Sequence, residues 1–398
     1  MLTKRKLLGT LAALAVAVPA GITAVSTYTA QAATVPATIP LSFTNNTGRT
    51  EPVYLYVMGT NLTTGRLGYA NAAGQFTAWS GGANPPVAAP DVAIPGPANG
   101  KSVTIQLPKL SGRVYFSFGS KLKFFLTPDG LVQPAVQNPS DPNRDTLFDW
   151  SEFTLNDGGL WLNSSQVDMF AIPHTVGVTA ADGTVKTTGK VVDGGRRKVL
   201  DGLQSWGNGW QNLIYTRPDG LRVRALAPGK GIDAGVFSAT QLDPYITRSW
   251  DTYRTKTLTV LPFTDQPNTR FLGRTQGNAM VFTNAAGQTV ATFQKPSTAN
   301  VFGCDGALQA PNDNVVGPIA RTLCAALNRS TLAEISTQPS TDASKFYQTT
   351  PTNQYAKYIH ANMVDGRAYA FAFDDVGAFE SLVHDGSPKA ASISLPAF

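Results

Sequence analysis

The sequence predicts a mainly β fold, an antiparallel β-barrel or sandwich, combined with a mixed α/β domain. From residue 34 to about residue 185, short runs of β-branched and aromatic residues alternate with Gly, Pro and Asn turn signals, and no helical period is present. Beyond Gly194, helix-like stretches alternate with strand-like runs. The run Ala368–Phe373 again alternates like a strand. We therefore expect the chain to return to the β domain there.

The individual elements follow in chain order. The strands predicted in the first part are Val53–Val57, Ser102–Leu107, Arg113–Phe118 and Lys123–Leu126. The helices predicted in the second part are Arg196–Trp206, Ala239–Thr255, Val315–Leu327 and Asn353–Met363, with strands at Thr257–Phe263 and Ala279–Thr283. The expected division is residues 33–185 and 365–398 for the β domain and 186–364 for an inserted α/β domain. The length of 398 residues suits two domains, and two consecutive domains are the alternative.

The N-terminus has the features of a signal peptide, residues 1–32. Three basic residues at positions 4–6 precede the apolar run Leu7–Val18, and a small-residue cleavage motif ends at Ala32. The apolar run is shorter than the roughly 20 residues that span a membrane, so we expect cleavage near Ala32 and secretion to the extracellular space. Without the three basic residues the net charge falls from +6 to +3. No basic-aromatic stripe is present, so we expect neither a nucleic-acid nor a membrane partner.

Cysteine and histidine usage fits a secreted protein without a metal. Cys304 and Cys324 could form one disulfide in an oxidising environment. The three histidines are too scattered to complete a metal site, and we expect no metal and no cofactor. The sequence also lacks the common nucleophile, zinc-protease and nucleotide-binding motifs, and nothing local supports a Ser-His-Asp triad.

One segment carries candidate catalytic chemistry. Glu152, Thr154 and Asn156 alternate with two apolar residues and so share one face of a predicted strand. A loop rich in Gly and Asn then leads to a second strand-like run that contains Asp168, which suggests a hairpin. If this hairpin closes about Trp161, Asp168 lies opposite Glu152 or Thr154 on the same face.

Opposed carboxylates repel each other, so such a pair needs a reason. One acid can hold a proton while the other stays ionised, which is the division of labour in glycoside hydrolysis. Trp161 in the loop could stack on a pyranose ring, and Thr154 and Asn156 supply polar groups beside it. The alternatives are that both acids are solvated surface residues, or that one pairs with an Arg of the second domain.

This segment resembles glycoside hydrolase family 64, the secreted bacterial β-1,3-glucanases that release laminaripentaose from long β-1,3-glucans. The matching residues are Glu152-Phe153-Thr154-Leu155-Asn156, Trp161 and Val167-Asp168. The stretches Val167–Pro173 and Tyr369–Asp375 also resemble strands of thaumatin-like proteins, whose barrel this family shares. The resemblance covers nearly all of the chain after the signal peptide.

The resemblance implies an inverting mechanism, in which Glu152 is the general acid and Asp168 the general base. It also implies a thaumatin-like barrel and an α/β domain flanking a wide groove that holds a long β-1,3-glucan. The substrate contacts that it implies are Thr154, Asn156 and Trp161. Asp374 and Asp375, at the end of the returning strand, either line the same groove or are solvated strand-end residues.

Two other functions compete with β-1,3-glucan hydrolysis. One is a thaumatin-like protein that binds β-glucan without cleaving it, and the other is a glycosidase that acts on another polysaccharide, such as chitosan. A binding protein has no need of an opposed carboxylate pair, which favours hydrolysis. The residues alone leave inversion and retention open, because a hairpin can supply either carboxyl separation. We expect a monomer, because the sequence has no coiled-coil period and no exposed apolar stretch.

Overall fold

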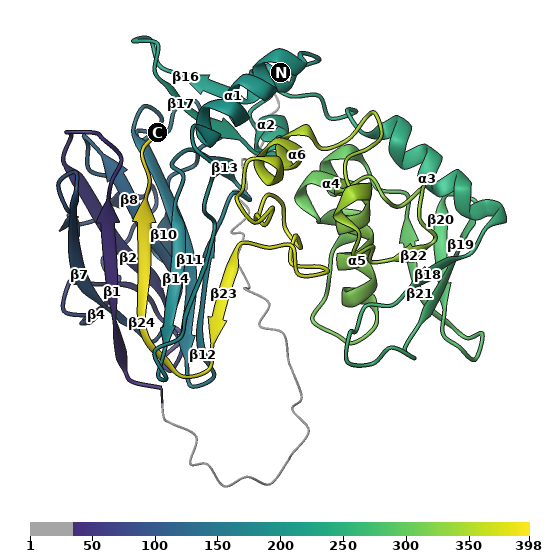
Figure 1. The fold of residues 1–398 in the computed structure, drawn as a ribbon, viewed down its shortest axis with the longest axis horizontal. Helices are drawn as coiled ribbons and strands as arrows, with labels where there is room; N and C mark the ends of the chain where they lie inside the picture. Colours follow the sequence, from purple (N-terminus) through teal and green to yellow (C-terminus); the bar gives the residue numbers. More distant parts are fainter. Residues whose placement is uncertain (1–34) are drawn as a thin grey trace, which may run out of the picture. The chain divides into compact units, whose positions relative to one another are not determined.

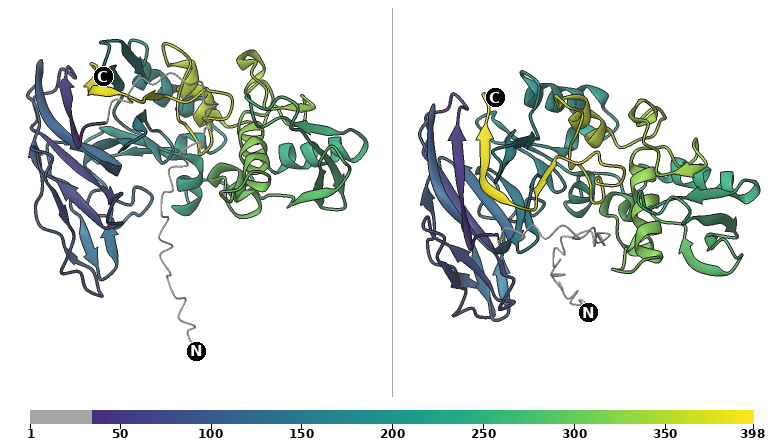
Figure 2. Two further views of the ribbon diagram at one scale, coloured as in Figure 1. Left: turned by 90° about the horizontal axis from the view of Figure 1, so that it is seen from below. Right: turned by 60° about the horizontal axis from the view of Figure 1, so that its bottom comes forward.

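Two large sheets surround one hydrophobic core in the computed structural model, which describes residues 35–398 (Figure 1). The first sheet has five strands in the order β15-β14-β24-β1-β7. Its strands are β1 (Thr38–Asn45), β7 (Lys101–Pro108), β14 (Thr175–Ala180), β15 (Val185–Thr188) and β24 (Pro388–Leu395). β1 and β24 pair in parallel, whereas the other neighbours are antiparallel. The last strand therefore lies beside the first, as the yellow and purple arrows of Figure 2 show.

The second sheet has eight strands and is antiparallel throughout. Seven of them follow the order β23-β12-β11-β8-β2-β3-β4, and the short β6 pairs with β2. These strands are β2 (Val53–Asn61), β3 (Leu67–Ala70), β4 (Phe76–Ala78), β6 (Ile94–Pro95), β8 (Leu110–Phe118), β11 (Leu147–Asn156), β12 (Gly159–Ser164) and β23 (Leu382–Asp385). A small sheet of order β10-β9-β5 completes the region, with β5 (Val87–Ala88), β9 (Phe125–Thr127) and β10 (Gly130–Val132).

The two large sheets pack as a sandwich. Alternate residues of both sheets share one buried cluster, and the rings of Phe43 on β1 and Phe116 on β8 lie with centroids 5.5 Å apart. Within residues 35–398, no edge strand of one sheet pairs with an edge strand of the other. The two sheets are therefore open at their edges. A closed barrel needs a continuous hydrogen-bonded seam, so the predicted barrel is wrong and its sandwich alternative is confirmed. A thaumatin-like relationship stays a prediction.

A second hydrophobic core gathers helices and shorter sheets, as the sequence texture after Gly194 predicts. A five-stranded sheet has the order β21-β20-β19-β18-β22, and helix α3 (Asp243–Thr255) packs on its strand β19. The strands are β18 (Leu258–Val260), β19 (Phe271–Gln276), β20 (Ala279–Thr283), β21 (Thr289–Gln294) and β22 (Thr337–Gln338). A three-stranded sheet of order β13-β17-β16 consists of β13 (Met169–Phe170), β16 (Ile214–Thr216) and β17 (Arg222–Leu226).

The four predicted helices are confirmed with small shifts at their ends. The helices are α1 (Gly195–Trp206), α2 (Pro228–Asp233), α3 (Asp243–Thr255), α4 (Thr298–Gly303), α5 (Val316–Asn328) and α6 (Gln354–Ala361), and the 3-10 helices are Trp210–Leu213, Gly306–Leu308 and Ala343–Lys345. The sequence did not indicate α2 and α4, because six residues are too few to establish a helical period. Local signals were present nonetheless: Pro228 begins α2, and Ser297 and Asn300 form a capping box at the start of α4.

The predicted strand Ala368–Phe373 does not form. Tyr369 makes an isolated bridge to Ser165, and the chain then turns. The backbone N–H groups of Asp374, Val376 and Ala378 each donate to the carbonyl three residues earlier. The Asp374 carboxylate accepts the backbone N–H of Ala370, which folds the segment onto itself. Alternating apolar residues here fill a core around a turn instead of one face of a sheet. The chain returns to the sandwich later, at β23 and β24.

Three further predictions concern covalent and cellular features. Cys304 and Cys324 form a disulfide that links the end of α4 to α5, with Cα atoms 5.6 Å apart. The predicted signal peptide, residues 1–32, lies outside the described residues. None of the helices in the described part of the chain combines the length and hydropathy needed to cross a bilayer. The proposed domain boundaries stay predictions.

Candidate active site

Glu152 and Arg113 meet across two central strands of the eight-stranded sheet. The register of β11 against β8 places Glu152 directly opposite Arg113. The guanidinium donates to Glu152 Oε1 from Nη2 at 3.0 Å and from Nε at 3.2 Å. Glu152 is only 9% exposed, so the contact lies largely out of solvent. A charge-assisted pair in this environment is stronger than one at the surface.

The hairpin that follows Glu152 has a different register from the predicted one. β11 and β12 pair with Glu152 opposite Asn163 and Thr154 opposite Trp161. The connection is thus the two-residue turn 157–158, an Asp-Gly sequence that is a strong hairpin signal in itself. Closure about Trp161 is therefore wrong, and so is the placement of Asp168 directly across from Glu152 or Thr154. Trp161 lies on a strand rather than in a loop.

Asp168 reaches the same centre by another route. It lies after β12, immediately before β13, and its backbone carbonyl accepts the N–H of Ala227 at 3.0 Å. Its Oδ2 is 3.6 Å from Arg113 Nη2, and its Oδ1 is 3.3 Å from Lys230 Nζ on α2. The two predicted carboxylates consequently flank one guanidinium, although they are not paired across a hairpin.

The Arg113 side chain is enclosed on its remaining sides. Its guanidinium carbon lies 4.6 Å from the Trp150 ring centroid, and its Nη1 donates to the Tyr115 hydroxyl at 3.3 Å. Burial opposes the positive charge, but Tyr115 and the carboxylates of Glu152 and Asp168 outweigh it and raise the pKa of Arg113. Arg113 therefore remains charged between the two acids.

The other predicted site residues on this hairpin lie on the same face of the sheet as Glu152. Phe153 and Leu155 point the other way into the sandwich core, as the alternation predicts. Thr154 Oγ1 is 3.0 Å from Ser111 Oγ, and Asn156 Oδ1 accepts the N–H of Gly158 in the turn. The Trp161 ring stacks on His384 of β23, with centroids 4.2 Å apart. Their contact with a substrate stays a prediction.

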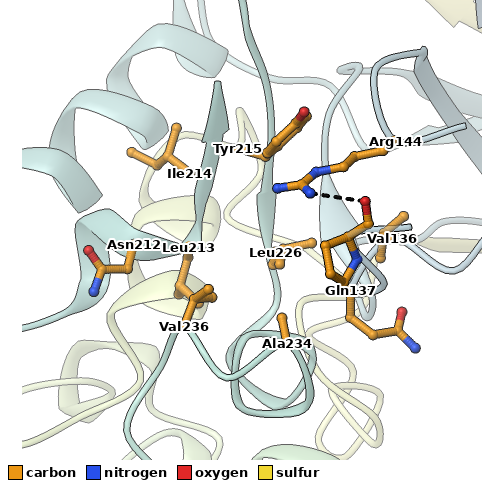
Figure 3. A pocket seen from close by; sticks show the side chains of 11 residues that line it. Val136, Gln137, Arg144, Asn212, Leu213, Ile214, Tyr215, Leu226, Ala234 and Val236 are labelled. Carbon is orange, nitrogen blue, oxygen red and sulfur yellow. Dashed lines mark hydrogen bonds between the residues drawn. The ribbon is translucent and has the colours of Figure 1, made fainter. Parts of the chain in front are cut away.

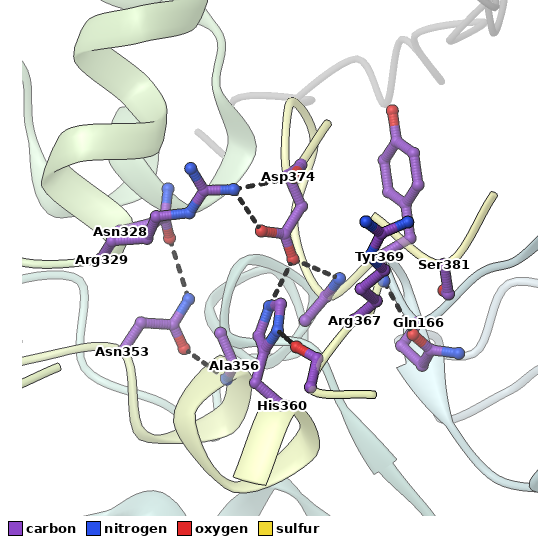
Figure 4. Close-up of polar contacts among 12 residues, drawn as sticks. Gln166, Asn328, Arg329, Asn353, Ala356, His360, Arg367, Tyr369, Asp374 and Ser381 are labelled. Atoms are coloured by element: carbon purple, nitrogen blue, oxygen red, sulfur yellow. Dashed lines mark hydrogen bonds and ion pairs between the residues drawn. The ribbon is translucent and has the colours of Figure 1, made fainter. Parts of the chain in front are cut away.

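Gln166 fixes the chain two residues before Asp168. Its side-chain oxygen accepts the N–H of Tyr369 at 3.0 Å, and its own N–H donates to the Tyr369 carbonyl at 2.8 Å. Its amide nitrogen donates to the Ser164 carbonyl, and the Tyr355 hydroxyl donates to the Gln166 carbonyl at 2.6 Å. Figure 4 shows Gln166 beside Tyr369. This buried amide thus joins the end of β12 to the turn segment after Gly366.

Asp374 lies in a buried ion-pair network (Figure 4). It is fully buried, and its oxygens pair with Arg329 Nη2 and His360 Nε2, both at 2.8 Å. Both carboxylate oxygens therefore contact protein groups, because the turn at 371–378 directs this side chain inward, and the predicted strand-end solvation is wrong for Asp374. Its contact with a substrate stays a prediction. Asp375 is exposed on the same turn, and its contact with a substrate stays a prediction.

A separate pocket of about 200 Å³ lies beside β16 and β17 (Figure 3). Its lining is mainly aliphatic, with Arg144 donating to the Pro139 carbonyl at 3.0 Å on one side. It includes Leu226, which pairs with Met169, the residue after Asp168. No carboxylate is among its lining residues, whereas Glu152 and Asp168 both lie at the Arg113 centre.

Arg113 and Lys230 were not among the site residues predicted from the sequence. A weak signal existed for Arg113, because strand alternation places it on the same face as Tyr115 within the predicted strand Arg113–Phe118. Lys230 had no usable signal, because its helix is too short to show a period.

Comparison with known proteins matches this architecture over nearly its whole length. The family model of glycoside hydrolase family 64, described as β-1,3-glucanase, matches residues 37–395. A glucan endo-1,3-β-glucosidase of Arthrobacter sp. (strain YCWD3) is 54% identical over 389 residues, which cover 97% of this chain and 70% of that protein. The crystal structure of a laminaripentaose-producing β-1,3-glucanase in complex with laminaritetraose is similar with a TM-score of 0.89 and 55% identity, covering 91% of this chain and 99% of that one. A β-1,3-glucanase domain from Clostridium beijerinckii has a TM-score of 0.75 and 25% identity, covering 90% and 98%.

Proposed function

The chain belongs to glycoside hydrolase family 64 and is a β-1,3-glucanase, and we propose that it releases laminaripentaose from long β-1,3-glucan with inversion at the anomeric carbon. The observation that carries the proposal is the convergence of Glu152 and Asp168 on the Arg113 guanidinium. The likeness to a laminaripentaose-producing enzyme supports the product.

In this mechanism Glu152 donates its proton to the glycosidic oxygen as the bond from that oxygen to the anomeric carbon breaks. Asp168 accepts a proton from the water whose oxygen bonds to the same carbon from the opposite face. Lys230 Nζ lies 3.3 Å from Asp168 Oδ1 and, among the described residues, pairs with no other acid, which supports Asp168 rather than Glu152 as the partner that starts ionised. The two acids then exchange protonation states over one turnover.

Substrate contacts are proposed along the polar face of β11 and β12. Trp161 supplies a flat apolar surface, and Thr154 lies directly opposite it on the neighbouring strand. Sugar sites combine such surfaces with a few placed hydroxyl and amide groups. Asn156 lies on the same face, two residues beyond Thr154, and accepts the N–H of Gly158 in the adjacent turn.

Product analysis tests the proposal. Incubation with linear β-1,3-glucan is expected to release mainly laminaripentaose, with the α anomer appearing first because an inverting enzyme turns the β linkage over. Chromatography of early products measures the length, and ¹H NMR during the first turnovers measures the anomer. A first product with β configuration would refute inversion, and a broad range of lengths would refute pentasaccharide release. Binding to insoluble glucan without soluble sugars would refute hydrolysis itself.

Secretion is proposed from the N-terminal sequence. Expression of the full chain in a bacterial host with an intact secretion pathway is expected to give extracellular protein that begins near Ala33. N-terminal sequencing or intact-mass measurement of the culture supernatant checks this. Protein that retains residues 1–32 and stays with the cells would contradict it.

A further inference from the structure

We infer that Arg113 is a positioning residue that holds Glu152 and Asp168 and stabilises the negative charge as it moves from one to the other during hydrolysis. The inference rests on the proposed roles of the two acids. It adds a third group to the reaction centre, with a function that can be tested separately from theirs.

The geometry places one nitrogen between the two acids. Arg113 Nη2 is 3.0 Å from Glu152 Oε1 and 3.6 Å from Asp168 Oδ2. Arg113 Nε donates to the same Glu152 oxygen, so Oε1 accepts two hydrogen bonds from the guanidinium. Within residues 35–398, no hydrogen bond is made to Glu152 Oε2. This second oxygen is therefore the one that carries the transferred proton.

The proton transfers of the proposed reaction explain why the position of Arg113 between the two acids matters. In the proposed reaction Asp168 starts as the charged base and Glu152 starts as the proton-bearing acid. After Glu152 has protonated the leaving oxygen and Asp168 has taken the proton of water, Glu152 is charged and Asp168 is neutral. The pair keeps one negative charge throughout, and that charge moves toward the acid that lies closer to Arg113. A fixed cation that interacts more strongly with the later charge distribution lowers the barrier without any rearrangement.

The surroundings of Arg113 favour a strong effect. Its side chain is 14% exposed, so solvent screens its charge weakly. Hydrogen bonds to Tyr115 and to Gln133 on the other guanidinium nitrogen, Nη1, fix its orientation. Trp150 covers one side of the guanidinium at 4.6 Å. A residue held in this way needs no reorganisation when the charge moves.

Among the titratable groups described around Glu152 and Asp168, Arg113 is the cation that contacts both acids. Lys230 on α2 contacts only Asp168, at the oxygen that Arg113 does not use. Tyr115 on β8, Tyr355 on α6 and Tyr369 after α6 also face the two acids. Burial raises the pKa of each of these phenols, so they are neutral at working pH. The pH dependence of activity should thus respond to the loss of Arg113.

Replacement of Arg113 by Gln tests the inference. Arg113→Gln is expected to lower kcat about 100-fold, the size seen when a group aimed at developing charge is removed, with KM changed less than about threefold. Arg113 attracts negative charge at both acids, so its removal should move both limbs of the pH profile of kcat/KM to higher pH. Arg113→Lys keeps the charge and should restore the wild-type limbs and part of kcat.

Lys109 provides a matched control. It carries a positive charge just before β8 and pairs with exposed Asp157 at 2.6 Å, away from both acids. Lys109→Gln should leave kcat and the pH profile unchanged. Far-ultraviolet circular dichroism and thermal unfolding check that each variant is folded. If Arg113→Gln does not fold, Arg113→Lys still decides, because displaced pH limbs in a folded Lys variant would contradict a role carried by the charge.

Two outcomes would overturn the inference. One is an Arg113→Gln enzyme with wild-type kcat and pH limbs, and the other is an equal loss in the Gln and Lys variants with unmoved limbs, which would indicate a structural role. These outcomes differ from a failure of the proposed function. In that case Glu152→Gln or Asp168→Asn would keep full activity, whatever Arg113 does.

Discussion

Replacing Glu152 by Gln or Asp168 by Asn is expected to lower kcat on β-1,3-glucan by about 100- to 10,000-fold, the range that a positioned acid or base contributes. Both substitutions keep the size of the side chain and an oxygen that can accept from Arg113 or Lys230. The loss should consequently appear in kcat rather than in folding. Reducing-sugar assays at saturating substrate measure it.

A substrate with a better leaving group separates the two roles. A nitrophenolate departs without protonation, so Glu152→Gln should recover much of its activity on a nitrophenyl glycoside of a β-1,3-linked oligosaccharide. Asp168→Asn should stay inactive on the same substrate, because water still needs a base. Equal recovery of both variants would contradict these roles.

Asp157→Asn is the matched control for both acid substitutions. This carboxylate lies in the neighbouring turn with its side chain 95% exposed, and it pairs only with Lys109 among the described residues. Its substitution should leave kcat unchanged, because no contact joins it to Glu152 or Asp168. A large loss in this control would show that charge on the hairpin in general, rather than the two acids, governs activity.

Replacing Arg329 by Met is expected to lower the free energy of unfolding by about 3–5 kcal/mol, the cost of leaving a buried charge without its partner. Arg329 is 2% exposed and donates from Nη2 to Asp374 Oδ1 at 2.8 Å and to the Asp374 carbonyl at 2.7 Å. The rings of Phe346 and Phe379 lie on it at 4.9 Å each. Methionine can fill that apolar space but cannot neutralise Asp374. Urea denaturation measures the change.

Two comparisons make the Arg329 prediction specific. Arg254→Met removes an exposed arginine that pairs with Asp251 at 2.9 Å, and it should change stability by less than about 0.5 kcal/mol. Arg329→Met combined with Asp374→Asn should be less destabilised than the sum of the single variants, because the unpaired charge is gone. A single Arg329→Met variant within 1 kcal/mol of wild type would contradict the expectation.

The ion pairs of Asp374 also make the stability of the fold depend on pH in the acidic range. Burial opposes ionisation of Asp374, but His360, Arg329 and the N–H of Ala370 outweigh it and lower its pKa below the ordinary 3.8. A lowered folded-state pKa stabilises the fold above the unfolded value, and this stabilisation is lost as pH falls through the folded value. Wild-type protein should therefore lose more stability below about pH 4 than Asp374→Asn does.

Local patterns were sufficient for most secondary structure and for the polar face of β11. Alternation of period two placed Glu152 and Thr154 opposite Phe153 and Leu155, and the sheet confirms it. The helices over 196–206, 239–255, 315–327 and 353–363 followed from apolar periodicity alone, since packing one face of a helix requires it. Where periodicity was absent, as in the short helix that carries Lys230, prediction failed.

Register and turns required more than periodicity. An error of a few residues in the centre of the hairpin moved Asp168 to the wrong partner, because alternation specifies a face but not a position along it. The run around Tyr369 has a strand pattern yet forms a turn. There Asp374 is held inward by contacts that include Arg329, 45 residues earlier in the chain, which a local pattern does not reveal.

The sequence by itself determined the family, the mixed composition of the fold and the two acids proposed for catalysis, because these depend on residue types and short-range spacing. The tertiary structure alone decided how those acids meet. Arg113 lies 39 residues before Glu152, and Lys230 comes from a helix after β17, so their contacts arise from strand pairing and core packing over long separations. Electrostatic interactions act through space, and the charge environment of a site therefore follows from the fold rather than from spacing along the chain.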